Sequence, residues 1–208
     1  LPYWMNHMID DENGGFYGRI TGNGVLMPNA EKGAVLNARI LWTFSAAYRV
    51  LRQDKYLVTA SRAKRYLIDH FYDQSYGGIY WSLDKNGEPL DTKKQIYAIG
   101  FAIYGLSEYH RATGDSEALE YAVKLFHDIE EHSFDHTKNG YCEALTREWE
   151  EIADMRLSKK DANERKTMNT HLHILEPYTN LYRVWKNDLL EKQLRNLIHL
   201  FINKILNK

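Results

Sequence analysis

Three stretches of the chain are apolar on most helical faces and predict inner helices, at roughly residues 33–52, 93–113 and 166–186. Each is followed by a stretch with apolar residues at helical spacing, as in Leu119, Ala122 and Phe126, which predicts an amphipathic helix. A helix that is apolar on most faces must be buried on most sides. We therefore expect an all-α fold in which outer helices wrap a ring of inner helices.

A turn motif recurs and divides the chain into similar units. Asp10–Tyr17 is repeated at Asp73–Tyr80 and, more loosely, at Asp135–Tyr141, and the first residues of the three copies are 63 and 62 residues apart. Equal spacing predicts stacked supersecondary units, and each unit has room for two helices. A few β-prone residues after each turn predict short hairpins in the loops. The repeat thus predicts an α/α toroid, or half of one.

Two features refine the loops. Gly114-Asp115 and Asn187-Asp188 each place a helix-ending residue before an Asp that can cap the next helix, which predicts tight helical hairpins. The third unit is longer than the others, with about ten extra residues between Tyr141 and Lys166, which is long for a connection without a task. We expect this segment to form a loop or hairpin over the mouth of a pocket.

The arginines near the ends of the inner helices set a common register: Arg49, Arg111 and Arg183. In this register one helical stripe collects four polar residues among apolar neighbours: Arg39, Tyr97, Asn169 and His173. A buried Arg is costly unless it is paired, so such a stripe favours a binding site over ordinary packing.

The last predicted inner helix carries two further signals. His171 and His173 are two residues apart and point to nearly opposite faces, so we expect no shared metal ion. Pro177 has no amide hydrogen, so the carbonyl of His173 loses its helical partner. We expect the helix to bend there.

The amino-acid composition limits the kinds of ligand that the protein is expected to bind. Lys and Arg number 27 and Asp and Glu 28, which favours neither nucleic acid nor an anionic membrane and indicates a neutral ligand. Aromatic residues make up 13% of the chain and supply stacking faces for sugar rings. The single Cys142 excludes an intrachain disulfide framework and suits a reducing, cytoplasmic location. The chain begins at Leu1 without an initiator Met, so a preceding helix or leader could have been removed.

Four segments carry a resemblance to a known family: Gly14–Gly18, Asn37–Ser45, Gln95–Ala98 and Lys166–Glu176. They resemble the N-acylglucosamine 2-epimerase family, and Lys166–Glu176 resembles its cellobiose 2-epimerase branch. The resemblance implies an (α/α)6 barrel of about twice this length. Residues 1–208 are then expected to form the N-terminal half of one barrel domain, as monomer or homodimer.

The resemblance also implies a chemistry. The enzyme would open the reducing-end ring, remove the C2 proton, pass through a cis-enediolate and return the proton to the opposite face, without a cofactor or metal. Arg39 and His173 are the implied catalytic residues, and Tyr97 and Asn169 the implied sugar contacts. We add Trp42 and Glu176 as further sugar-binding candidates. The two histidines that transfer the proton would lie in the second half, so residues 1–208 alone are expected to be inactive.

The sequence is compatible with several functions. The expected substrates are β-1,4-linked disaccharides, with cellobiose converted to glucosylmannose and lactose to epilactose. N-Acylglucosamine 2-epimerases and aldose–ketose isomerases share the fold and much of the chemistry. An α/α-barrel glycoside hydrolase commonly needs two carboxylates, whereas the stripe offers at most Glu176. A noncatalytic sugar-binding module is a third alternative.

Overall fold

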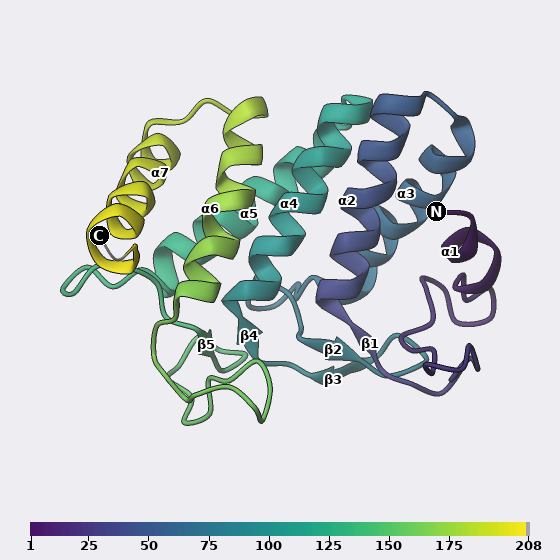
Figure 1. Ribbon diagram of the computed structural model, residues 1–208, viewed down its shortest axis with the longest axis horizontal. Coiled ribbons are helices and arrows are strands. Elements are labelled where there is room, and N and C mark those ends of the chain that lie inside the picture. Colours follow the sequence, from purple (N-terminus) through teal and green to yellow (C-terminus); the bar gives the residue numbers. More distant parts are fainter. Residues whose placement is uncertain (207–208) are drawn as a thin grey trace.

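The computed structural model describes residues 1–206, which form two rows of helices with hairpin loops gathered at one end (Figure 1). The inner helices lie side by side and are α2 (Ala34–Leu51), α4 (Ile96–Thr113) and α6 (Met168–Val184). Each is followed by an outer helix, namely α3 (Asp54–Tyr66), α5 (Ser116–His132) and α7 (Asp188–Leu200). The predicted helical hairpins are confirmed.

The remaining helical pieces are short. Helix α1 (Pro2–His7) opens the chain, and the π-helical turns η1 (Leu67–Phe71) and η2 (Phe201–Ile205) extend α3 and α7. Across residues 1–206, none of the helices combines the length and the apolar character needed to cross a lipid bilayer.

Helix α4 lies between α2 and α6, and two glycines set how closely it approaches them. A Cβ atom on Gly105 would lie 2.8 Å from the carbonyl oxygen of Ala38 in α2. A Cβ atom on Gly100 would lie 2.4 Å from the carbonyl oxygen of His173 in α6. Both distances are too short for a real Cβ contact, so a side chain at either position would push the helices apart.

The strands are short and flank the N-terminal ends of the inner helices (Figure 1). One antiparallel sheet has the order β1 (Lys32–Gly33), β2 (Ser82–Leu83) and β3 (Pro89–Asp91). A second pairs β4 (Lys94–Gln95) with β5 (Ala144–Leu145). The short hairpins predicted in the loops are therefore present. Because Lys94 and Gln95 join a strand, α4 begins at Ile96, later than the expected residue 93.

The same ion pair holds each copy of the repeated turn. The first Asp of the turn pairs with a Lys just before the next inner helix, in Asp10–Lys32 at 2.8 Å, Asp73–Lys94 at 2.9 Å and Asp135–Lys166 at 2.6 Å. The Asp also accepts backbone hydrogen bonds inside its own turn, as Asp73 does from Ser75 and Tyr76. This pair fixes the turn against the helix start.

The predicted helix caps are confirmed between α4 and α5 but not between α6 and α7. Gly114 ends α4 in the left-handed conformation, with φ of 78°, and the Asp115 carboxylate caps α5 by accepting from the Ala118 amide. At the second break the predicted cap, Asp188, is wrong. The Asn187 side chain accepts from the Leu189 and Leu190 amides, and its extended backbone is the usual geometry of an N-cap.

Candidate active site

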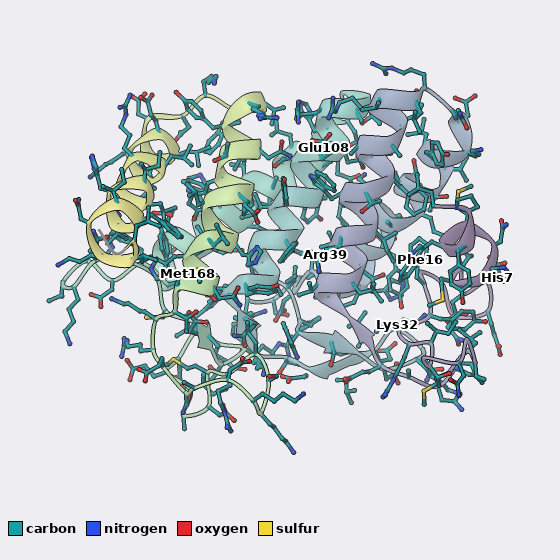
Figure 2. All side chains as sticks on the ribbon, in the orientation of Figure 1. His7, Phe16, Lys32, Arg39, Glu108 and Met168 are labelled. Carbon is teal, nitrogen blue, oxygen red and sulfur yellow. The ribbon has the colours of Figure 1, made fainter. Side chains whose placement is uncertain are left out.

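Residues from all three inner helices line one cavity of about 250 Å³. Figure 2 shows Arg39 on α2, beside α4. The lining residues are Arg39, Trp42 and Thr43 from α2, Phe101 and Tyr104 from α4, and His173 and Glu176 from α6. The sequence-predicted residues Arg39, Trp42, His173 and Glu176 therefore meet at one surface.

Two aromatic rings lie beside the His173 ring. Its ring centroid lies 4.7 Å from that of Tyr97 and 5.0 Å from that of Phe101. The Arg39 guanidinium carbon lies 5.1 Å from the Phe101 ring centroid, within range of a cation–π interaction. Phe101 thus contacts the imidazole and the guanidinium and holds the two polar groups near each other.

The Glu176 carboxylate orients the His173 ring. His173 Nδ1 lies 2.8 Å from Glu176 Oε2, one helical turn away, and the His173 side chain is 19% exposed. An ionised carboxylate can only accept, so Nδ1 carries the proton in this pair. Nε2 is then the nitrogen left for other partners.

Two tyrosines of α4 keep their hydroxyl protons at neutral pH. Burial raises the pKa of Tyr97, Glu176 adds to the increase, and Arg39 opposes it. Burial also raises the pKa of Tyr104, helped by Glu176 and Glu108. Both side chains are therefore neutral groups that can donate a hydrogen bond.

Arg39 differs from the sequence-based expectation in its burial. The residue is exposed, so the argument from the cost of a buried Arg was wrong for this chain. Among residues 1–206 no carboxylate forms an ion pair with Arg39, so its N–H donors remain available to a ligand.

Tyr97 and Asn169 do not line the cavity, whereas Trp42 does. Asn169 is exposed in the first turn of α6 and is not a lining residue, so its expected convergence with the stripe is not seen among the described residues. Trp42 lies 5.2 Å from the Tyr104 ring, and its buried Nε1 has no hydrogen-bond partner within residues 1–206. Because this N–H is buried, Trp42 offers its ring and not its N–H to the cavity.

The sequence-based prediction did not include Thr43, Phe101 and Tyr104, which also line the cavity. Tyr104 lies three residues after Phe101 and seven after Tyr97, so helical spacing from Tyr97 could have found it. Thr43 follows Arg39 by four residues and could have been found in the same way.

The segment between Tyr141 and Lys166 does form a hairpin, with Leu145 bridging Glu151. It packs on the second turn motif, where Trp149 Nε1 donates to the Tyr76 carbonyl at 2.6 Å. None of its residues lines the cavity of about 250 Å³, so its expected place over the mouth is not observed.

His171 faces away from the cavity. Its Nε2 accepts from the Tyr141 amide at 3.0 Å, and its Nδ1 lies 2.6 Å from the Thr167 carbonyl. Burial lowers the pKa of His171, which favours the neutral ring. In the part of the chain that the structure describes, no three His, Cys, Asp or Glu side chains are grouped to hold a metal ion.

The paired inner and outer helices, with a cavity lined by the inner ones, place the chain among α/α-barrel proteins. Residues 15–208 match the N-acylglucosamine 2-epimerase (GlcNAc 2-epimerase) family, and the chain belongs to that family. It is 78% identical to a cellobiose 2-epimerase of Bacteroides fragilis over 100% of this chain and 53% of that protein. It is 44% identical to a cellobiose 2-epimerase of Ruminococcus albus over 94% of this chain and 49% of that protein. The chain thus spans about half the length of these relatives.

Solved structures support the same fold. A cellobiose 2-epimerase from Bacillus thermoamylovorans superimposes with a TM-score of 0.96 at 45% identity, over 100% of this chain and 53% of that one. A D-mannose isomerase reaches a TM-score of 0.82 at 22% identity over 98% of this chain and 49% of that one, which shows the fold alone. The expected barrel type, with about half of the ring present, is confirmed.

Proposed function

We propose that this chain is the N-terminal half of an epimerase domain that inverts C2 of the reducing-end glucose in β-1,4-linked disaccharides. The proposal is supported by the 78% identity to a cellobiose 2-epimerase. The observation that carries the chemistry is a cavity in which Arg39 and His173 meet beside neutral tyrosines. Residues from the other half of the barrel would supply the proton-transfer groups.

Arg39 stabilises the charge that develops during the reaction. Removing a proton next to a carbonyl builds negative charge on the oxygens of a cis-enediolate, and an oriented donor is worth about 3–4 kcal/mol there. The guanidinium has no protein carboxylate to neutralise it among residues 1–206, and the Phe101 ring holds it in place. Its donors can therefore act on the sugar oxygens.

His173 holds the opened sugar. With Nδ1 bonded to Glu176, its Nε2 can accept a hydrogen bond from a sugar hydroxyl, and the Tyr97 hydroxyl can donate one close by. Trp42 adds an apolar ring face. These groups bind a neutral, hydroxyl-rich ligand, as expected for a disaccharide.

A hydrolase receives less support from the cavity. Glycoside hydrolysis commonly uses two carboxylates that flank the scissile bond. Within the part of the chain that the structure describes, Glu176 is the single carboxylate among the lining residues, and it is already bonded to His173.

The experiment is to incubate the complete protein that contains this chain with cellobiose, lactose and N-acetylglucosamine, and to resolve the products by chromatography. We expect glucosylmannose from cellobiose and epilactose from lactose. Three results would contradict the proposal. Turnover of N-acetylglucosamine alone would indicate an N-acylglucosamine 2-epimerase, a ketose product an aldose–ketose isomerase, and release of free glucose a glycoside hydrolase. Residues 1–208 alone are expected to give no product, because half of the cavity wall would be absent.

A further inference from the structure

One backbone carbonyl of α6, that of His173, faces α4 without its usual helical hydrogen-bond donor. Pro177 lacks an amide hydrogen, so the carbonyl oxygen of His173, four residues earlier, has no N–H to accept from at its usual helical partner. That oxygen lies against Gly100 of α4, where a Cβ atom would be 2.4 Å away. The Pro177 ring is next, with its Cγ 3.5 Å from the same point.

The hydrogen that replaces a side chain on Gly100 therefore points at the His173 carbonyl oxygen. Such Cα–H···O contacts recur between closely packed helices and contribute modestly. The carbonyl also belongs to the residue whose ring stands 4.7 Å from Tyr97 and 5.0 Å from Phe101, the residues three before and one after Gly100. Backbone and ring of His173 thus dock on the same turn of α4.

We infer that Gly100 and Pro177 together are positioning residues, which seat the His173 backbone on α4 and so set where its imidazole stands in the cavity. The inference rests on the proposed function of that cavity. Pro177 releases the carbonyl from its helix, and Gly100 leaves the space that the carbonyl occupies. Neither residue appears in the cavity lining, so they act through His173.

The test is Gly100→Ala in the complete enzyme. The new methyl would have to move the backbone of α4 or α6 by roughly 1 Å to reach a normal contact distance. A displacement of that size at a catalytic group lowers rates by about 100-fold, so we expect kcat to fall about 10- to 100-fold while KM changes less than about threefold.

Two further variants separate positioning from simple loss of stability. Leu181→Ala, a buried residue on the same helix, is the control: it should lower Tm but keep kcat within about twofold of the wild type. Pro177→Ala restores an amide that can bind the His173 carbonyl and draw it back toward the α6 axis. The double variant Gly100→Ala/Pro177→Ala should therefore recover about fivefold or more of the kcat lost in Gly100→Ala.

A spectroscopic readout keeps this inference separate from the proposed function. The His173 ring lies close to the Tyr97 and Phe101 rings, whose ring currents affect the His173 proton resonances. These resonances, assigned by their loss in His173→Gln, should shift in Gly100→Ala but not in Leu181→Ala. If the wild-type enzyme had no epimerase activity, the proposed function would be wrong. The chemical shifts would still test whether Gly100 sets the position of His173 on α4. Unmoved His173 resonances, or a Gly100→Ala enzyme that loses Tm alone, would overturn the inference.

Discussion

Two polar clusters lie on the inner helices, about 15 Å apart along α2, because Arg49 follows Arg39 by ten positions. One is the cavity cluster of Arg39, His173 and Glu176. The other, which we call the Glu108 cluster, consists of Arg49, Glu108, Arg111 and Asn180. Both place arginine on an inner helix, but their hydrogen bonding differs.

The side chains of the Glu108 cluster form hydrogen bonds and ion pairs with one another. The buried Glu108 carboxylate accepts from Arg49 Nε at 2.7 Å and from Arg111 at 2.7 Å, and Arg111 also donates to the Asn180 side-chain oxygen at 3.0 Å. Each inner helix contributes at least one member. These charges therefore stabilise the helix packing and leave few donors for a ligand.

The cavity cluster is left incomplete by the protein. Arg39 is exposed and has no ion-pair partner among residues 1–206, so its N–H donors are available to a ligand. A paired arginine on an inner helix therefore contributes to stability, whereas an unpaired arginine facing a cavity is available to a ligand. Variants of the two clusters should accordingly affect different properties.

The largest expected effect is that of Arg39→Ala in the complete enzyme. Loss of the donor for the enediolate should lower kcat by about 100- to 1,000-fold, with a much smaller change in KM, because the charge exists mainly in the transition state. Steady-state kinetics on cellobiose measure this. Since Arg39 is exposed and unpaired among the described residues, Tm should stay close to that of the wild type. An effect confined to KM would leave Arg39 with substrate positioning only.

Glu108→Ala should show the opposite pattern. Removing the carboxylate leaves two arginines without their shared partner, and because both arginines are partly exposed we expect a loss of about 2–3 kcal/mol in the free energy of unfolding. Urea unfolding measures this loss. The fraction of enzyme that remains folded should keep a near-normal kcat. A large selective loss of kcat would place Glu108 in the reaction and remove the contrast.

Glu176→Gln should have a smaller effect on activity. An amide can still contact Nδ1 of His173, but it no longer selects the tautomer that leaves Nε2 as the acceptor. We expect kcat/KM to fall about 10-fold, with Tm unchanged because Glu176 is 43% exposed. Glu176→Ala is the comparison and should lose more. Equal activity of Glu176→Gln and the wild type would show that the pair does not orient the ring.

The smallest effect concerns pH and the ion pairs of the turns. Burial would raise the pKa of Asp73, but hydrogen bonds from Arg147 and Lys94 outweigh it and hold the pKa below its ordinary value of 3.8. The unfolded chain then binds more protons, so the stabilisation is complete above about pH 5 and is lost as the pH falls below 3.8. Urea unfolding at pH 5, 4 and 3 should show stability falling as the pH drops below 3.8, and Asp73→Asn should weaken that decline.

The sequence predicted the features that depend on local periodicity. Apolar spacing located the inner helices, and the register of the repeats brought Arg39, Tyr97 and His173 together. It could not give the burial of Arg39, because a helical face is visible in the sequence but the number of neighbours on that face is not. The ion pair Asp73–Lys94 was missed since its partners are 21 residues apart and meet only when the turn folds back.

Incorporation of deuterium from solvent at C2 tests whether the enzyme removes and replaces the C2 proton with the help of Arg39. The complete enzyme is incubated with cellobiose in D2O, and the sugars are examined by NMR. The account predicts deuterium at C2 of the epimer formed, because the proton removed on one face is replaced on the other by an exchangeable group. It also predicts that exchange slows about 100-fold or more in Arg39→Ala. Epimers formed without deuterium at C2, or exchange that is as fast in Arg39→Ala as in the wild type, would contradict it.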